Sequence, residues 1–336
     1  MRITADAPLV HCNTLRLPAR AEWCASVGTP AELAEALAFA RSRALPVCVL
    51  GGGSNVVLRE RIPGCVLLMR MQGEDVLEHG GAVVRLRVAA GTCWHDFVLA
   101  CHARGWYGLE NLALIPGTVG AAPVQNIGAY GVELAAFVEE VGAVDRATGE
   151  RCTFTRADCR FAYRHSIFKG ELAERTVITD VTFRLPLDAA VQADYPALRA
   201  ALDGAADPTP AEVLRAVLAI RRQRLPDPQR LPNVGSFFHN PVLERARFES
   251  LRTRHPDVVH WADGERVKLA AAWLVEQAGG KAMREGAARV HERQALVLVN
   301  DGDATATEVL ELARRIAAAV AARFGVELRI EPAIYG

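Results

Sequence analysis

The spacing of hydrophobic positions predicts a helix that begins near residue 30. The segment Thr29-Pro30-Ala31-Glu32 offers a capping threonine, a proline at the first helical position and a glutamate three residues after the cap. Leu33, Leu37 and Ala40 then recur at helical spacing. The same pattern at Thr209-Pro210-Ala211-Glu212 predicts a second helix through about residue 222. We interpret the similarity as the same helix-capping pattern occurring twice, and not as an internal sequence repeat.

Short apolar runs and alternating patterns predict the strands. Val84, Leu86 and Val88 alternate with arginines, which is typical of a half-buried strand at 83–90. The other predicted strands are 47–50, 151–154, 176–185, 295–300 and 326–331. The other predicted helices are 92–104, 267–278 and a long helix after the cap Thr305-x-x-Glu308, ended by Gly325. Strands and helices in this mixed order indicate an α+β chain.

Length and proline content suggest how the chain is divided. A chain of 336 residues corresponds to about two domains, or to three small ones. Three prolines interrupt regular structure between residues 225 and 232, so we place a domain boundary there.

Charge and cysteine usage narrow the class of protein. Lys plus Arg and Asp plus Glu both total 39, and the zero net charge argues against a dedicated nucleic-acid binder. The longest uncharged run, 111–132, is rich in glycine and amide side chains and contains two prolines, so we expect no membrane span. Residues 1–8 have no signal-peptide pattern. Eight cysteines without a CxxC pair predict reduced thiols in a cytoplasmic protein, with no metal site.

A glycine-rich segment follows the predicted strand at 47–50. In Gly51-Gly52-Gly53-Ser54-Asn55, consecutive backbone N–H groups are able to converge on an anion, with side-chain donors from the last two residues. The segment is neither a P-loop nor GxGxxG, because no Gly-Lys-Ser/Thr follows and Val56 stands where the last glycine belongs. A plain tight turn is the alternative.

A second segment, IPGTVGAAPVQNIGAYG at 115–131, is rich in glycine and free of charge. Small residues allow a ligand to approach the backbone, while Gln125 and Asn126 offer amide groups. A long loop of this composition is unusual as mere surface. It therefore favours ligand binding over a surface loop.

Three further segments carry reactive side chains. Tyr163-Arg164-His165-Ser166-Ile167-Phe168-Lys169 mixes cations with aromatics, which suits an anion clamp or a solvated edge strand. In Asn233-Val234-Gly235-Ser236-Phe237-Phe238-His239-Asn240-Pro241, the serine is by itself a turn residue, because no Gly-x-Ser-x-Gly elbow is present. Glu331, beside Pro332, is by itself an ordinary exposed carboxylate.

Together these segments resemble one family, the UDP-N-acetylenolpyruvoylglucosamine reductases (MurB). The matching pieces are 50–55, 115–131, 163–169, 233–241, Lys268-Leu-Ala-Ala-Ala-Trp-Leu274 and Glu331-Pro332, in the family's order. The segment around Tyr195 makes the chain similar to the longer, type I form. The resemblance implies a vanillyl-alcohol-oxidase-like (PCMH-type) FAD-binding fold of two α+β subdomains and a third α+β substrate-binding domain. The implied domains are 1–70 with 323–336, then 71–222, then 223–322.

The resemblance also implies a reaction. UDP-N-acetylglucosamine enolpyruvate would be reduced to UDP-N-acetylmuramate, with NADPH as co-substrate and FAD as cofactor, in a cytoplasmic protein that we expect to be a monomer. We expect FAD to be bound non-covalently, because neither glycine loop contains His or Cys. We expect no metal, nucleic acid or membrane partner.

The family match assigns roles to individual residues. Arg164 and Glu331 would stabilise the enolate, and Ser236 would deliver a proton to C2. FAD would be bound by Gly51, Gly52, Gly53, Ser54, Asn55, Pro116, Gly117, Thr118, Gly120, Ala121, Gln125, Asn126, Gly128 and Tyr130. The UDP moiety would be bound by Tyr195, Arg224, Asn240 and Gln294. Arg224 departs from the family, where lysine is commoner. It replaces the compact ammonium group of lysine with a planar guanidinium group. His165 and His239 stand at variable positions and receive no role.

Two other functions compete with this one. Another FAD oxidoreductase of the same fold, such as an alcohol or sugar oxidase, would share the phosphate-binding segments but not Arg164, Ser236 and Glu331 together. A flavin- or nucleotide-binding regulatory module would have the ligand loops without these three residues.

Overall fold

The computed structural model describes residues 1–188 and 190–336, which form two compact units. Unit 1 comprises Met1–Ala7, Ala21–Gly53 and Pro63–Gln223, and unit 2 comprises Pro8–Arg20, Ser54–Ile62 and Arg224–Gly336. The chain passes between the units five times, at 7/8, 20/21, 53/54, 62/63 and 223/224, and the third of these passages lies inside the segment 51–55. Residues 323–336, which we assigned to the first FAD-binding subdomain, lie in unit 2. The three-domain division remains a prediction.

A four-stranded sheet with the order β1-β2-β5-β3 forms the first part of unit 1. Its elements are β1 (Ile3–Pro8), β2 (Arg20–Val27), α1 (Pro30–Ser42), β3 (Val47–Leu50) and β5 (Arg61–Met69). Thr29 caps α1 in a complete capping box with Glu32, which confirms the predicted helix start. Strand β3 has the predicted bounds and runs parallel to β5.

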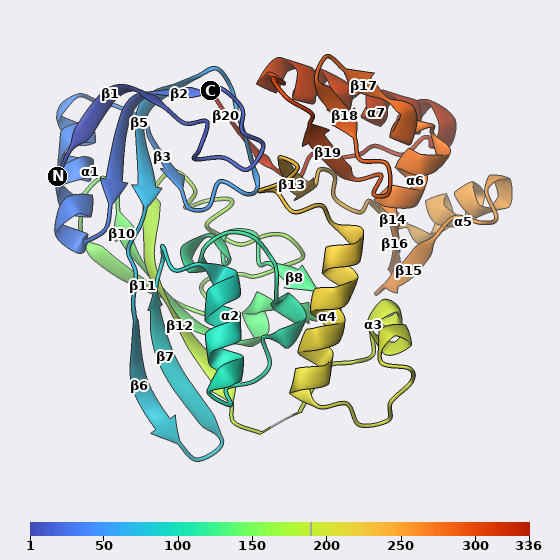
Figure 1. Cartoon of the computed structure of the whole chain (residues 1–336), viewed down its shortest axis with the longest axis horizontal. Helices are drawn as coiled ribbons and strands as arrows, with labels where there is room; N and C mark the ends of the chain where they lie inside the picture. Colours follow the sequence, from blue (N-terminus) through green and yellow to red (C-terminus); the bar gives the residue numbers. More distant parts are fainter. Residues whose placement is uncertain (189) are drawn as a thin grey trace. The chain divides into compact units, whose positions relative to one another are not determined.

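A five-stranded antiparallel sheet with the order β11-β10-β12-β7-β6 forms the second part of unit 1. Its elements are β6 (Glu74–Gly80), β7 (Val83–Ala89), α2 (Trp94–Ala103), β10 (Val138–Asp145), β11 (Arg151–Thr155) and β12 (Thr176–Pro186). Figure 1 shows β6 and β7 as a long hairpin beside α2. The unit also contains β8 (Gly128–Ala129), β9 (Val132–Glu133), α3 (Pro196–Ala201) and α4 (Pro210–Arg224), and 3-10 turns at Glu110–Leu112, Val119–Ala121 and Leu134–Ala136.

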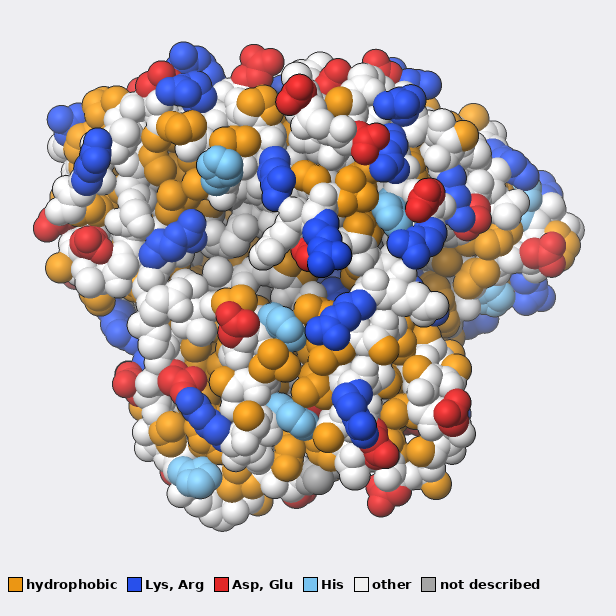
Figure 2. Space-filling model, viewed as in Figure 1, with side chains coloured by type: hydrophobic (Ala, Val, Ile, Leu, Met, Phe, Trp, Pro, Cys, Tyr) orange, Lys and Arg blue, Asp and Glu red, His pale blue; other side chains and the backbone are white. Residues whose placement is uncertain are grey.

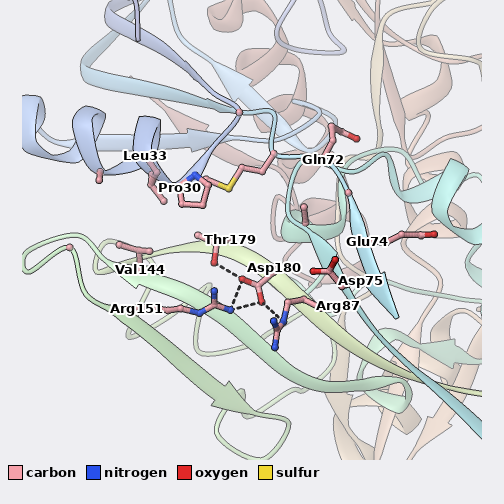
Figure 3. Close-up of a pocket in the computed structure, with 16 residues that line it drawn as sticks. Pro30, Leu33, Gln72, Glu74, Asp75, Arg87, Val144, Arg151, Thr179 and Asp180 are labelled. Atoms are coloured by element: carbon pink, nitrogen blue, oxygen red, sulfur yellow. Dashed lines mark hydrogen bonds and ion pairs between the residues drawn. The ribbon is translucent and has the colours of Figure 1, made fainter. Parts of the chain in front are cut away.

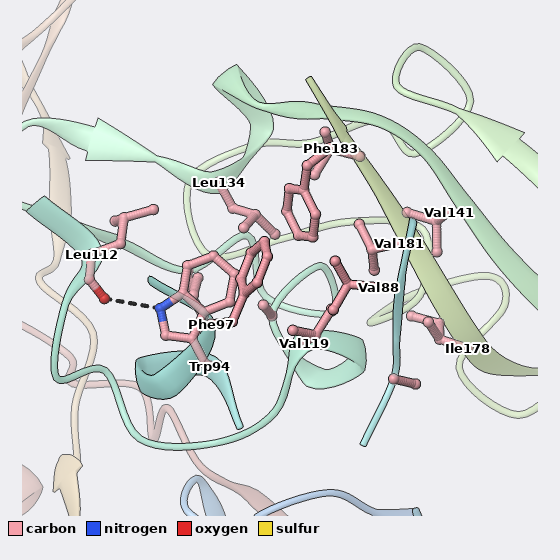
Figure 4. Close-up of a cluster of buried hydrophobic side chains, with 14 of the residues drawn as sticks. Val88, Trp94, Phe97, Leu112, Val119, Leu134, Val141, Ile178, Val181 and Phe183 are labelled. Atoms are coloured by element: carbon pink, nitrogen blue, oxygen red, sulfur yellow. Dashed lines mark hydrogen bonds between the residues drawn. The ribbon is translucent and has the colours of Figure 1, made fainter. Parts of the chain in front are cut away.

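Helix α2 packs its apolar side on the five-stranded sheet (Figure 4). The ring centroid of Phe183 on β12 lies 6.1 Å from that of Trp94 and 5.1 Å from that of Phe97. The indole Nε1 of Trp94 donates to the Leu112 carbonyl at 2.9 Å. Val119, inside the segment 115–131, is fully buried in the same core. The core therefore holds this segment in place.

Unit 2 contains two small antiparallel sheets and a two-stranded parallel pairing. The sheet β13-β19-β18-β17 consists of β13 (Asn233–Ser236), β17 (Arg284–Glu285), β18 (Ala288–Val290) and β19 (Val297–Asn300). The sheet β14-β16-β15 consists of β14 (Val242–Glu244), β15 (His260–Asp263) and β16 (Arg266–Leu269). The remaining elements are β4 (Val56–Leu58), which pairs with β20 (Ala333–Tyr335), and α5 (Arg245–Arg254), α6 (Ala271–Gln277), the 3-10 turn Gly280–Ala282 and α7 (Ala306–Phe324).

Two predicted elements of unit 2 are wrong. The helix expected at 267–278 is strand β16 followed by the shorter helix α6, because the buried Val267 and Leu269 alternate with less buried positions and this segment pairs with two neighbouring strands. The strand expected at 326–331 is an extended segment in which Ile330 alone makes a bridge, to Phe238. The strand at this end of the chain is β20. Helix α7 is confirmed, with a capping box at Thr305 and Gly325 at its end.

Charged side chains of both signs are interspersed over the face of the molecule drawn in Figure 2. This pattern agrees with the equal totals of 39 basic and 39 acidic residues. In the part of the chain that the structure describes, no helix has the length and apolar character needed to cross a bilayer.

Candidate functional site

The two glycine segments predicted to bind a ligand lie against each other in unit 1. A Cβ atom on Gly51 would overlap Oγ1 of Thr118, and one on Gly52 would lie 3.0 Å from Cα of Gly117. Gly53 and Gly117 have φ angles of 62° and 124°, which favour glycine. We call Gly51–Gly53 with Gly117–Gly120 the glycine cradle. The two backbones approach most closely at Gly52 and Gly117, while the Thr118 side chain fills the space beside Gly51. Glycine-rich backbones of this kind allow a ligand to come close to the main chain.

The sheet of unit 1 fixes one side of the glycine cradle. The Gly120 N–H donates to the Ala90 carbonyl at 2.8 Å, directly after β7, and a Cβ on Gly120 would overlap the Ala90 side chain. On the other side, Nη1 of Arg70 donates to the Gly51 carbonyl at 3.2 Å. The sequence did not single out Arg70, because its contact with Gly51 depends on the pairing of β3 with β5.

Beyond the cradle, Gln125 is half-buried and Asn126 is fully buried. The Asn126 amide donates to Glu133 at 2.8 Å and to the Ala162 carbonyl at 3.2 Å, and its Oδ1 accepts from the Ala135 N–H at 3.0 Å. The side chain of Asn126 therefore holds the loop together. Its direct contact with a cofactor stays a prediction.

Four residues of this region have left-handed backbones without being glycine. The φ angles are 56° for Leu114, 45° for Asn126, 50° for Tyr130 and 52° for Arg164. Such backbones are costly and persist where the surrounding structure enforces them, which is common at ligand sites.

Contacts from two helices enforce the conformation of Leu114. Its N–H donates to Nδ1 of His95 on α2 at 3.1 Å, and its carbonyl accepts from Nη2 of Arg221 on α4 at 3.1 Å. Burial lowers the pKa of His95, with a further contribution from nearby arginines, so the imidazole is neutral at pH 7 and Nδ1 is free to accept. Arg221 also hydrogen-bonds the side chain of Tyr130, and burial lowers its pKa. Neither His95 nor Arg221 lies in a motif, so the sequence offered no signal for them.

Arg164 lies against the same loop. Its Nη2 donates to the Gly128 carbonyl at 2.6 Å and its Nη1 to the Asn126 carbonyl at 3.4 Å. Ser166, two residues on, donates to the Val124 carbonyl at 2.8 Å. The structure thus brings the segment 163–169 against the segment 115–131.

Tyr195 joins this group in unit 1. Its side chain is exposed and contacts Tyr130 edge to face, with ring centroids 5.5 Å apart. A predicted substrate residue and a predicted cofactor residue are therefore neighbours.

Unit 2 presents Ser236 at the end of β13. Gly235 has a φ of 72°, and its N–H donates to Oδ1 of Asn233 at 2.9 Å, so the chain turns just before the serine. Ser236 is exposed, whereas Phe237 and Phe238 are buried. The two phenylalanines fix the backbone and leave the hydroxyl accessible.

Glu331 pairs with the segment that directly follows β13. Its N–H donates to the Phe237 carbonyl at 3.0 Å, and the N–H of His239 donates to the Arg329 carbonyl at 3.0 Å. Unit 2 therefore pairs Glu331 with the residue next to Ser236 in sequence.

The remaining predicted residues of unit 2 have varied surroundings. Oδ1 of Asn240 accepts from the Ala271 N–H at 3.0 Å, at the start of α6, which leaves its amide group to donate. Gln294 is half-buried in the turn before β19, and Arg224 is exposed. Ser54 and Asn55 precede β4, and the Asn55 carbonyl accepts from the Ala333 N–H at 3.1 Å.

A separate cavity of about 510 Å³ lies within unit 1 between α1 and the five-stranded sheet (Figure 3). Its charged wall is an ion-paired group in which Asp180 contacts Arg151 at 3.0 Å and Arg87 at 3.6 Å. Thr179 also donates to Asp180, at 2.8 Å. None of the residues predicted from the sequence as site residues lines this cavity. Across residues 1–188 and 190–336, no cluster of His, Cys, Asp or Glu is arranged to hold a metal ion.

The fold and the glycine cradle define the class: an α+β protein that binds a dinucleotide cofactor without a Rossmann fingerprint. Residues 22–155, which contain the cradle, match the family model described as "FAD binding domain", and residues 227–335 match "UDP-N-acetylenolpyruvoylglucosamine reductase, C-terminal domain". The predicted FAD cofactor and the α+β FAD-binding fold are confirmed.

Relatives over the whole chain identify the family. UDP-N-acetylenolpyruvoylglucosamine reductase of Paraburkholderia phymatum is 50% identical over 98% of this chain and 96% of its own length. The Pseudomonas fluorescens protein of the same name is 45% identical over 100% of this chain and 99% of its own. The crystal structure of MurB from Thermus caldophilus has a TM-score of 0.68 at 25% identity, covering 100% of this chain and 98% of that one. The chain belongs to the UDP-N-acetylenolpyruvoylglucosamine reductase family and is an FAD-containing oxidoreductase.

The composition of the cradle predicts how FAD is attached. No His or Cys lies in 51–55 or 115–131, so acid denaturation should release all of the yellow colour into the supernatant. Cys93 is the residue to test for covalent attachment of the flavin. Its side chain is exposed, and its backbone forms a bridge with Thr118 of the glycine cradle. Flavin that stays on the polypeptide after acid treatment, and is lost in Cys93→Ser, would contradict non-covalent binding.

Proposed function

We propose that this chain reduces UDP-N-acetylglucosamine enolpyruvate to UDP-N-acetylmuramate with electrons from NADPH, and that Ser236 gives the proton to C2. The proposal rests on the backbone pairing in unit 2 between residues 237–239 and residues 329–331. An exposed Ser236 and a carboxyl group on Glu331 share one rigid scaffold, tied by the hydrogen bond from Glu331 N–H to the Phe237 carbonyl at 3.0 Å.

The cofactor site fits this role. The glycine cradle has no side chains at Gly51, Gly52, Gly53, Gly117 and Gly120, which would let the pyrophosphate of FAD approach the main chain. When bound, FAD supplies two-electron transfer between NADPH and the enolpyruvyl alkene.

The residues of the chain supply binding, charge stabilisation and a proton. When C3 of the enolpyruvyl group is reduced, negative charge develops on C2 and on the substrate carboxylate. Positioned hydrogen-bond donors or cations lower the free energy of that charged state. In this proposal Arg164 and Glu331 polarise the enolate, and Ser236 protonates C2 as general acid. A serine is a weak acid, but an enolate-type carbanion is a strong base. Proton transfer from the serine hydroxyl to C2 is therefore favourable.

Four residues would bind the UDP moiety: Tyr195, Arg224, Asn240 and Gln294. Arginine at 224, where lysine is commoner, keeps the charge and offers two parallel donors to a phosphate. We also propose a cytoplasmic location, supported by eight cysteines that occur as free thiols.

An anaerobic titration tests the function. NADPH should bleach the purified yellow protein, and UDP-N-acetylglucosamine enolpyruvate should restore the flavin absorbance with one UDP-N-acetylmuramate formed per turnover. Bleaching by an alcohol or sugar, with recovery by oxygen but not by the enolpyruvyl substrate, would indicate an oxidase. Failure to bleach would indicate a binding module.

The kinetic mechanism is a further prediction. The sequence contains no second dinucleotide fingerprint, so NADPH should use the substrate pocket in alternation with the UDP-sugar. Initial-rate plots should therefore be parallel, with competitive inhibition at high concentration of the UDP-sugar. Intersecting lines that require a ternary complex would refute a shared pocket.

A further inference from the structure

His239 lies beside Glu331 in unit 2, although its position in the motif gave it no role. Nδ1 of His239 is 3.3 Å from Oε2 of Glu331, and the two side chains are 21% and 14% exposed. The isolated bridge between Phe238 and Ile330 explains the contact. Residues on either side of that bridge point to its opposite face, so 239 and 331 are diagonal neighbours on one face.

The Nδ1 atom of the His239 imidazole faces an unusual environment. This atom is buried, and within the described residues it has no hydrogen-bond partner of good geometry. Oε2 of the Glu331 carboxylate lies within ion-pair distance of this atom. A buried polar atom without a partner is costly, so this arrangement favours a carboxyl group that stays near the ring.

We propose that His239 is a positioning residue, which holds the carboxyl group of Glu331 in the orientation that enolate stabilisation requires. The proposal rests on the function proposed above, in which Glu331 acts on the substrate. Loss of such a contact loosens the orientation of the carboxyl group, and small misplacements of a catalytic group cost up to about 100-fold in rate.

Two substitutions separate positioning from packing. An Asn amide, attached at Cγ, places a polar nitrogen near the position of Nδ1, whereas Leu places only methyl groups there. His239→Leu should slow reoxidation of the flavin by the enolpyruvyl substrate about 10-fold to 100-fold. His239→Asn should stay within about fivefold of wild type, since it keeps the contact. Bleaching by NADPH should be unchanged in both.

Controls and a measurement without turnover accompany these variants. His255→Leu removes a half-buried histidine elsewhere in unit 2, which contacts the Phe324 ring, and should leave both half-reactions unchanged. Affinity for UDP-N-acetylmuramate and the thermal midpoint should match wild type in His239→Asn. If His239→Leu fails to fold, His239→Gln replaces it, because its amide lies near Nε2 and should not rescue reoxidation. Equal rates for Asn and Leu, or equal loss in both half-reactions, would overturn the proposal.

A double-mutant cycle with Glu331→Gln distinguishes this proposal from the function on which it rests. If His239 acts through Glu331, His239→Leu should cost less than about threefold in the Glu331→Gln background. If Glu331→Gln alone has no effect, the proposed role of Glu331 is wrong. If Glu331→Gln slows reoxidation and the two effects multiply, the role of His239 is wrong and that of Glu331 stands.

Discussion

Ser236→Ala should slow reoxidation of the flavin by the enolpyruvyl substrate about 10²-fold to 10⁴-fold, the range expected for loss of a general acid. Bleaching by NADPH should stay within a few-fold of wild type, because that half-reaction needs no proton at C2. The substitution removes one exposed hydroxyl, and the packing of this strand depends on the buried Phe237 and Phe238. Folding and FAD content should therefore survive. Stopped-flow absorbance of the flavin measures the two half-reactions separately.

Two further variants make the assignment of Ser236 specific. Ser236→Cys should recover part of the rate, since a thiol also donates a proton. Ser250→Ala removes an exposed serine from α5 in the same unit and should change neither half-reaction. A turn serine without a chemical role predicts small and equal effects on both half-reactions. Unchanged reoxidation in Ser236→Ala would mean that the proton comes from another group.

Gly51→Ala should weaken FAD binding about 10-fold to 100-fold. The added Cβ overlaps Oγ1 of Thr118, which is buried, so the two loops of the cradle have to separate. Overpacking of this kind costs about 1–3 kcal/mol, and each 1.4 kcal/mol is about tenfold in affinity. Titration of the apoprotein with FAD, followed by quenching of flavin fluorescence, gives the dissociation constant.

Gly80→Ala is the matched control for this clash. Gly80 lies in the exposed hairpin strand β6, its φ is not in the left-handed region, and a Cβ there meets no atom within 4 Å. Its FAD affinity and far-ultraviolet circular dichroism should equal those of wild type. Wild-type affinity in Gly51→Ala would mean that the loops do not need close contact, and would remove the main structural support for the cradle.

The residues proposed to act on the substrate come from both units. Arg164 belongs to unit 1, while Ser236 and Glu331 belong to unit 2. Each unit supplies its residues from a segment tied down by backbone hydrogen bonds or a left-handed backbone, as at Arg164 with φ 52°. Segments held in this way lose little conformational entropy when a ligand binds them.

Helices and buried strands with local signals were predictable from the sequence. The capping boxes of α1 and α7 depend on residues three apart, and the start and glycine end of α7 follow from rules that act within one turn. Strand β3 is a short apolar run whose bounds agree with the prediction. The family-specific motifs likewise indicated the family and its cofactor, because each motif is contiguous in sequence.

Only the tertiary structure decided the features that depend on distant partners. Residues 266–269 form a strand because β14 and β15 pair with them, although their apolar run continues into a helix. Leu114 adopts its left-handed backbone because His95 and Arg221 bind it from two helices. His239 meets Glu331 because a single bridge brings together residues 92 positions apart. Such contacts arise from chain packing, and no local pattern of side chains encodes them.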